Sequence, residues 1–203
     1  MFTGLIETIG TVIETKHERN NLRLNIAAPI ARELRAGQSI AVDGVCLTVT
    51  AATNESFAIV AVSETLIRTT IAALRAGDKV HLERALSATD RFEGNFVQGH
   101  IDCVAMVVRV INKSGSRIVW FRLPRKLMRY VAPQGSLALS GISLTVVDVS
   151  GDLLSVALVP HTLQHTLADG WRRGTRVNVE VDIQAKYVVR AQSRAGHIRS
   201  SGE

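Results

Sequence analysis

The sequence predicts an all-β chain that contains two copies of one small antiparallel domain. Three observations support this fold class: the second half of the chain repeats the first, apolar residues alternate as they do in strands, and turn residues separate the alternating runs. The length of 203 residues suits two domains of about a hundred residues each. Alternation and turn spacing by themselves are compatible with a small barrel or a sandwich.

The repeat is clearest between residues 39–49, SIAVDGVCLTV, and residues 136–146, SLALSGISLTV, which lie 97 positions apart. This offset continues without a gap to Glu180, and near the chain start an offset of 95 pairs residues 4–7 with residues 99–102. Two copies are too few for a solenoid, so two compact domains are the simplest account. We predict domains at residues 1–92 and 93–184, joined in the charged, glycine-containing stretch DRFEGN, and a C-terminal tail at residues 185–203.

Local patterns predict the individual elements. Apolar residues with a period of two indicate half-buried strands, and one such strand would bury the even-numbered residues 104–110. The other strands contain Leu22, Leu24 and Ile26; Val45, Leu47 and Val49; Leu154, Val156 and Leu158; and Val177, Val179, Val181 and Ile183. One short helical piece is expected in each copy, at residues 65–74 and 162–169. The tail at residues 185–197 can form a helix, but its thin apolar face needs a partner to be ordered.

The chain is basic, with 24 Lys and Arg against 18 Asp and Glu, a net charge of +6 and a pI of about 9.9. Basic residues cluster in WFRLPRKLMR at residues 120–129, a pattern that also occurs on nucleic-acid surfaces. However, aromatic residues make up only 4% of the chain, no recognition-helix or RNP pattern occurs, and acidic residues are interspersed. We therefore expect no nucleic-acid partner and favour a solvated basic face, or attraction of anionic small molecules.

Several other protein classes lack their sequence signals. The longest uncharged run, residues 131–147, is too rich in glycine and hydroxyl residues to span a bilayer, so no membrane association is expected. The start, MFTGLIETIG, lacks the features of a secretory signal, which favours the cytoplasm. The phosphate-binding patterns GxxxxGK[ST] and GxGxxG are absent. No metal is expected, because Cys46 and Cys103 lie far apart in the sequence, and His161 and His165 lack the HExxH pattern.

Polar residues that match between the copies are candidates for recognising what two similar ligands share. These residues are Thr48 with Thr145 and Thr65 with Thr162. Their hydroxyls could meet an amide-rich ring or a polyol, although β-propensity alone also explains a threonine on a strand.

Polar residues that differ between the copies are candidates for what each ligand does. The differing pairs are Cys46 and Ser143, Leu5 and His100, Glu64 and His161, and Ala85 and Asp182. Most of the added polar chemistry is in the second copy, and His100, Ser143 and Asp182 in one domain could transfer protons near neutral pH. A Ser-His-Asp hydrolase is the alternative, but the GxSxG elbow is absent.

Five motifs resemble the riboflavin synthase family: MFTGLIE at residues 1–7, GVCLTV at 44–49, SETL at 63–66, NFVQGHID at 95–102 and GISLTV at 141–146. The resemblance implies two six-stranded antiparallel Greek-key barrels in tandem, followed by a C-terminal helix through which three subunits associate. It implies a transferase that moves a four-carbon unit between two molecules of 6,7-dimethyl-8-ribityllumazine, giving riboflavin and 5-amino-6-(D-ribitylamino)uracil in the last step of riboflavin biosynthesis. No cofactor or metal is implied.

The resemblance also implies which residues meet each lumazine. At the first barrel these are Gly4, Leu5, Ile6, Cys46, Leu47, Thr48, Val60, Ala61, Val62, Ser63, Glu64 and Thr65. At the second barrel they are Gly99, His100, Ile101, Gln134, Ser143, Leu144, Thr145, Ala157, Leu158, Val159, Pro160, His161 and Thr162. In the family, one active site joins the first barrel of one subunit to the second barrel of its neighbour, so a homotrimer is expected.

Residue roles follow from the same resemblance. His100, helped by Ser143 and Thr145, would transfer a proton at the acidic 7-methyl group of the lumazine or polarise the ring. Cys46 would stabilise or attack the partner ring, and Asp182 would lie at the junction. Little nucleophilic power is needed, because two rings held face to face react in an effectively unimolecular step.

Two positions depart from the family pattern. Ser140 stands where an acidic or amide residue usually precedes the glycine, as Asp43 does in the first copy, and Gln134 stands where a lysine can occur. A turn or ligand contact at the second site is therefore in question. The alternative function is that of a non-enzymatic relative that binds a lumazine or a flavin. Association with a lumazine synthase is left open.

Overall fold

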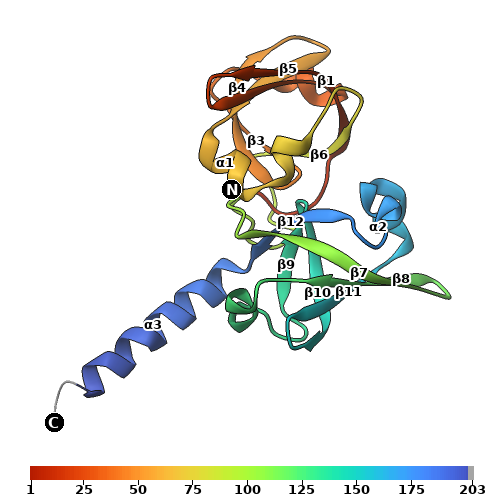
Figure 1. Cartoon of the computed structure of the whole chain (residues 1–203). Coiled ribbons are helices and arrows are strands. Elements are labelled where there is room, and N and C mark those ends of the chain that lie inside the picture. Colours follow the sequence, from red (N-terminus) through yellow and green to blue (C-terminus); the bar gives the residue numbers. More distant parts are fainter. Residues whose placement is uncertain (201–203) are drawn as a thin grey trace.

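Six strands from each half of the sequence close into an antiparallel barrel, and a C-terminal helix extends away from the barrels (Figure 1). This computed structural model describes residues 1–200, with side chains through residue 193. The two barrels confirm the predicted fold class. No helix in the described part of the chain is both long and apolar enough to cross a membrane.

The first barrel contains β1 (Thr8–Glu18), β2 (Asn21–Ala27), β3 (Ser39–Val42), β4 (Val45–Ala52), β5 (Ser56–Ala61) and β6 (Lys79–Arg84). Around the barrel the strand order is β1, β2, β5, β4, β3 and β6, with β6 closing against β1. Because β2 pairs with β5 and not with β3, the connections form a Greek key. A 3-10 turn at Pro29–Glu33, the helix α1 (Ser63–Arg68) and a 3-10 turn at Thr70–Ala73 complete this half.

The second barrel repeats this topology with β7 (Cys103–Lys113), β8 (Ser116–Arg122), β9 (Ser136–Leu139), β10 (Ile142–Ser150), β11 (Leu153–Leu158) and β12 (Arg176–Val181). Its order is β7, β8, β11, β10, β9 and β12. The connections contain a 3-10 turn at Arg125–Tyr130, the helix α2 (Pro160–His165) and a 3-10 turn at Leu167–Gly170, and α3 (Ile183–Ser200) follows.

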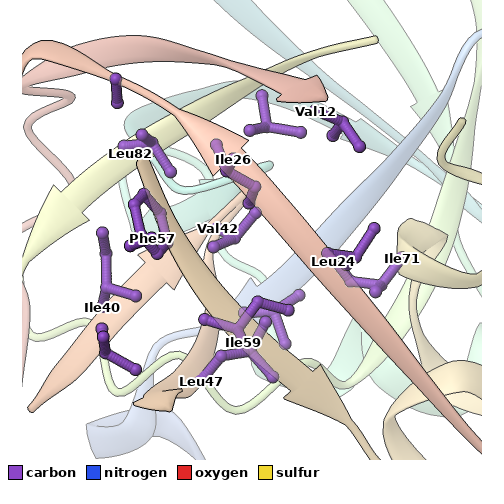
Figure 2. Packing of buried hydrophobic residues seen from close by; sticks show 14 of the residues in the cluster. Val12, Leu24, Ile26, Ile40, Val42, Leu47, Phe57, Ile59, Ile71 and Leu82 are labelled. Atoms are coloured by element: carbon purple, nitrogen blue, oxygen red, sulfur yellow. The ribbon is translucent and has the colours of Figure 1, made fainter. Parts of the chain in front are cut away.

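Each barrel is filled by its own apolar side chains, because alternate strand positions point inward. In the first barrel Ile26, Phe57 and Leu82 meet in the interior with at most 1% exposure (Figure 2). In the second barrel Phe121 packs edge-on against Trp171, with 5.4 Å between ring centroids. The chain therefore has two separate cores, as expected for a duplicated domain.

The predicted buried face of β7 is wrong before the bulge of this strand, although Val110, after the bulge, does pack against the second core. Ala105 and Val107 point into the barrel with 1% and 0% exposure, whereas Met106 is 47% exposed. A bulge in the pairing with β8, between Val107 and Arg109, then shifts the alternation by one residue. Both faces of this strand are apolar in sequence, so alternation alone could not identify the inner one.

Each predicted helical piece is in fact two shorter elements. Thr69 separates α1 from the following 3-10 turn because it is extended, with φ of −129° and ψ of 172°. Its hydroxyl accepts the Ile71 N–H at 3.3 Å and so begins the next turn. Thr166 does the same after α2, with its hydroxyl accepting the Ala168 N–H at 3.2 Å.

The C-terminal helix begins earlier than the tail pattern predicts. Strand β12 ends at Val181, and Ile183, which the alternation assigned to this strand, is the first residue of α3. The Asp182 carboxylate accepts the Gln184 N–H at 2.8 Å, which satisfies one of the free N–H groups at the helix start. The helix prediction for residues 185–197 is otherwise confirmed.

Two equivalent polar contacts join the barrels. His81 of β6 is 1% exposed; its Nε2 accepts the Leu167 N–H at 2.8 Å and its Nδ1 lies 2.9 Å from the Ser140 carbonyl. Because Nε2 is an acceptor, Nδ1 carries the proton that binds this carbonyl. Asn178, the repeat equivalent of His81, donates from Nδ2 to the Asp43 carbonyl at 2.9 Å and accepts a backbone N–H of the first barrel. The two barrels therefore meet in an interface with pseudo-twofold symmetry.

Ser140 keeps the turn contact that the sequence put in question. Asp43 and Ser140 both have positive φ, at 46° and 45°. The Asp43 carboxylate accepts the His81 N–H at 2.9 Å, and the Ser140 hydroxyl accepts the Asn178 N–H at 3.3 Å. The serine therefore makes the same contact with a neutral, more distant acceptor, which weakens it.

Candidate functional site

Two segments outside the barrels cross from one half of the chain to the other. We name residues 1–7 the N-terminal segment and residues 97–102 the linker segment. The two segments meet where Phe2 and Val97 exchange backbone hydrogen bonds of 2.8 and 3.2 Å. Ile6 of the N-terminal segment packs against the second core, and Ile101 of the linker segment packs against the first.

Each segment contacts the start of one strand at a glycine. The Gly99 carbonyl accepts the Cys46 N–H of β4 at 2.9 Å, and the Gly4 carbonyl accepts the Ser143 N–H of β10 at 2.8 Å. A Cβ atom added at Gly99 would lie 2.5 Å from the Cβ of Cys46, and one added at Gly4 would lie 2.5 Å from that of Ser143. Both glycines also have positive φ, at 80° and 77°. Only glycine permits both the conformation and the close approach.

These contacts correct the predicted grouping of site residues. The resemblance placed Gly4, Leu5 and Ile6 with Cys46, and placed residues 99–101 with Ser143. The structure shows the reverse assignment. The prediction failed because a repeat shows only which residues of the two copies are equivalent. It does not show whether each segment contacts the barrel of its own copy or the barrel of the other copy.

A buried carboxylate anchors each segment to the barrel whose first strand follows that segment. Glu180 of β12 accepts the N–H groups of Gln98, Gly99 and His100 at 2.8, 2.8 and 3.2 Å. Burial raises the pKa of Glu180 above its ordinary value, against the lowering effect of these hydrogen bonds and of Lys186. The carboxylate thereby fixes the backbone that presents His100 toward β4.

Glu83 of β6 holds the N-terminal segment in the same way. It accepts the Thr3 N–H at 2.6 Å, the Thr3 hydroxyl at 2.8 Å and the Gly4 N–H at 3.0 Å. Burial raises its pKa as well. Sequence reasoning matched Glu83 with Glu180 but did not assign either to the site. Their signal was an acidic residue at the same place in two strands that the repeat makes equivalent.

A cavity of about 210 Å³ lies between the linker segment, β4 and α1. Its lining includes six of the predicted site residues: Cys46, Glu64, Thr65, Gly99, His100 and Ile101. Arg68, which forms an ion pair with Glu64, also lines it. We name this cavity the first half-site. Pockets that enclose a small ligand usually measure about 300–1,000 Å³, so a ligand here would need a further wall.

The second half-site is the equivalent region around Ser143 and Gly4. Asn95 Nδ2 donates to the Ser143 hydroxyl, and the Ser136 hydroxyl donates to Asn95 Oδ1 at 3.2 Å. Asn95 was missed by the sequence analysis because it lies in the stretch assigned to the domain linker. Asp182 lines a small cavity together with Asn95 and Ser136.

The predicted grouping of His100, Ser143 and Asp182 is therefore divided. His100 lies with Cys46 in the first half-site, whereas Ser143 and Asp182 both adjoin Asn95 in the second. A proton-transferring trio within one barrel does not form in the single chain. Any reaction that uses all three residues requires the two half-sites to meet.

The remaining predicted residues differ in how they can meet a ligand. Thr48 and Thr145 point outward from β4 and β10, and Val62 and Val159 are about half exposed at the starts of α1 and α2. Inward-facing residues can offer only backbone atoms to a ligand outside the barrel; they are Leu47, Ala61, Leu144 and Leu158. The others, Val60, Ser63, Ala157, Pro160 and Thr162, lie along the ends of β5 and β11 and in the two helices.

Two further positions distinguish the second half-site. Gln134 is exposed in the turn before β9, with a φ of 65° at a position where the first copy has Gly37. His161 of α2 stacks on His165 with 4.1 Å between ring centroids, whereas the equivalent residues in α1 are the Glu64 and Arg68 ion pair. The polar groups of the two half-sites are therefore unequal although their backbones match.

The two cysteines lie in different surroundings. Burial is the main cause that raises the pKa of the Cys103 thiol to about 12, with a smaller contribution from Asp102. Because the thiolate is the nucleophilic form, Cys103 is almost entirely protonated at neutral pH. Cys46 lines the first half-site and is the candidate for chemistry. Among the side chains described, no three His, Cys, Asp or Glu residues come together to hold a metal ion.

Two barrels with paired half-sites define the class of protein. A family model described as the lumazine binding domain matches residues 3–85 and again residues 98–182. The same architecture occurs in LumP complexed with 6,7-dimethyl-8-(1'-D-ribityl) lumazine, with a TM-score of 0.80 and 22% identity over 89% of this chain and 99% of that chain.

Curated relatives specify the family within this class. The riboflavin synthase of Bacillus subtilis (strain 168) is 36% identical over 196 residues, covering 96% of this chain and 91% of the relative. The riboflavin synthase of Mycobacterium tuberculosis (strain ATCC 25618 / H37Rv) is 38% identical over 201 residues, covering 97% and 100%. The chain belongs to the riboflavin synthase family and is an enzyme.

Proposed function

We propose that this enzyme converts two molecules of 6,7-dimethyl-8-ribityllumazine into one riboflavin and one 5-amino-6-(D-ribitylamino)uracil. The observation that carries the proposal is the pair of half-sites: one backbone framework occurs twice, with unequal polar groups. One compound that serves once as donor and once as acceptor of a four-carbon unit fits such a pair. The reaction is a dismutation, so its atoms balance without a cofactor.

In this reaction the protein mainly positions the two rings. Held face to face, they react without the entropic cost of an encounter, which can contribute about 7–11 kcal/mol. His100 and Cys46 would meet the ring in the first half-site, where His100 moves a proton at the 7-methyl group or polarises the ring, and Cys46 stabilises or attacks it. Ser143, Thr145 and Asp182 would meet the other ring and the junction.

The active site would form between chains of a homotrimer. The first half-site, at 210 Å³, needs a further wall, and a second half-site from a neighbouring chain would supply it. The helix α3 extends from the barrels (Figure 1), with Tyr187 67% and Val188 56% exposed beyond the ion pair between Lys186 Nζ and Asp102 Oδ2, at 2.8 Å. These residues would pack against the partner chains.

The proposal is tested by incubating the purified protein with 6,7-dimethyl-8-ribityllumazine alone. We expect riboflavin to accumulate, with two lumazines consumed for each riboflavin formed. Tight binding without riboflavin formation would instead identify a lumazine or flavin carrier. In the same assay His100→Ala should lower the turnover by about a hundredfold or more while retaining lumazine binding. Unchanged turnover with intact binding would remove His100 from the mechanism.

A further inference from the structure

A second open cavity, of about 680 Å³, lies on the second barrel between the β7–β8 hairpin and the turn before β12. Four arginines line it: Arg109, Arg117, Arg172 and Arg173. Asp169 is the one acidic residue in its lining. The surface is separate from both half-sites, and the proposed reaction makes no use of it.

The acidic residue neutralises only one of these arginines. Arg117 forms an ion pair with Asp169, with 3.0 Å between Nη2 and Oδ1, and its Nε donates to Asn112 Oδ1 at 3.0 Å. Arg109, Arg172 and Arg173 are exposed, and none of them has an acidic partner among the residues with described side chains. Three arginines without an acidic partner therefore line one open surface.

The first barrel serves as an internal comparison, since it has the same fold. Both β1 and β7 have a bulge at the equivalent place, which aligns Glu14 with Arg109. Ala76 stands at the position of Arg173. Arg75 stands at the position of Arg172, and its Nη1 donates to the carbonyls of Ala72 and Leu74 at 3.2 and 2.8 Å. The fold alone therefore does not require this positive charge.

The net positive charge of the protein is also confined to the second part of the chain. Residues 1–92 contain ten basic and ten acidic residues, whereas residues 93–203 contain fourteen basic and eight acidic ones, so the second part carries all of the +6. Charge that only maintained solubility would not need to be confined to one of two equivalent barrels.

We propose that Arg109, Arg172 and Arg173 form a docking surface for an acidic segment of a partner protein. Planar guanidinium groups bind carboxylates through paired hydrogen bonds. A single-stranded nucleic acid would need exposed aromatic rings on which its bases stack, whereas Trp171, which lines this cavity, is 7% exposed. A small phosphate ligand usually binds in an enclosed site with converging backbone N–H groups, and this cavity is shallow and open.

The test measures binding of a fluorescent oligoglutamate peptide to the full-length protein. The variant R109A/R172A/R173A removes three positive charges from the docking surface. The matched control R23A/R75A/K79A removes three exposed positive charges from the first barrel, so both variants have the same net charge. We expect the first variant to bind the peptide at least about tenfold more weakly than the control, with wild-type turnover in both. Peptide affinity of the wild type should fall with added salt.

Equal weakening in the two variants would show attraction by net charge only and would overturn the proposal. The same titration with a single-stranded RNA and with pyrophosphate tests the other anions. One contrary result is that the loss of the three arginines weakens binding of the RNA or of pyrophosphate more than it weakens binding of the peptide. In that case the surface binds that anion, and the assignment to an acidic protein segment is wrong.

Discussion

Gly99→Ala is expected to destabilise the protein and to reduce its turnover by more than about tenfold. The added Cβ would lie 2.5 Å from the Cβ of Cys46, so the linker segment must move away from β4. Two features depend on the position of the linker segment: the hydrogen bond from the Cys46 N–H and the position of His100 in the first half-site. The positive φ of 80° adds a penalty of about 1–2 kcal/mol for any residue with a Cβ.

Gly77→Ala is the matched control for the backbone penalty. Gly77 has a φ of 96°, but a Cβ added there meets no atom within 4 Å. The control should therefore lose stability through its backbone conformation alone and keep its turnover. Urea unfolding and steady-state kinetics on both variants separate the two effects. If Gly99→Ala loses no more stability and no more turnover than Gly77→Ala, the close approach of the linker segment to Cys46 is irrelevant.

Glu180→Gln is expected to have a comparable effect by a different route. The carboxylate accepts three backbone N–H groups, and glutamine would turn an NH₂ donor toward at least one of them. A buried N–H left without an acceptor costs about 1–3 kcal/mol, so the unfolding free energy should fall by that amount. His100 follows the freed backbone, so turnover should fall as well.

The stability that Glu180→Gln removes should depend on pH. Because burial raises the pKa of Glu180 above 4.5, the folded protein binds its proton more tightly than the unfolded chain does. This contribution to stability is present below pH 4.5 and is lost as the pH rises through the folded pKa. The advantage of the wild type over Glu180→Gln should therefore grow as the pH is lowered toward 4.5 in urea-unfolding measurements. A difference that shrinks over this range would contradict the assignment.

Glu83→Gln provides the comparison within the same molecule. It should release the N-terminal segment from β6 and perturb the second half-site, because Glu83 holds Thr3 and Gly4. Alkylation of Cys46 can report on the first half-site, which Glu180→Gln should alter and Glu83→Gln should leave unchanged. Identical effects of the two variants on Cys46 would show that the segments do not act separately.

The sequence predicts the fold well because the signals for it are local. The repeat and the alternation in β2, β4, β11 and β12 identify two equivalent all-β units, and the turn residues between the strands are consistent with their short connections. Strand β7 is the exception, since apolar residues lie on both faces and a bulge interrupts the alternation.

The candidate site is harder to predict because it depends on contacts between the halves. The sequence identifies Cys46, Ser143, Gly4 and His100, but not which segment reaches which barrel. Asn95 has no repeat equivalent that would mark it. Such pairings depend on tertiary packing across the pseudo-twofold interface, and no local pattern contains that information.

The most direct test asks whether one active site combines half-sites from two chains. Gly99→Ala alters the first half-site, and Gly4→Ala, with its Cβ 2.5 Å from that of Ser143, alters the second. Co-expression of both variants with different tags allows mixed oligomers to be purified. If the site lies between chains of a ring-shaped trimer, each mixed trimer has one interface that joins two intact half-sites, so roughly a third of the wild-type rate should be restored. Mixed oligomers no more active than either parent would contradict an active site shared between chains.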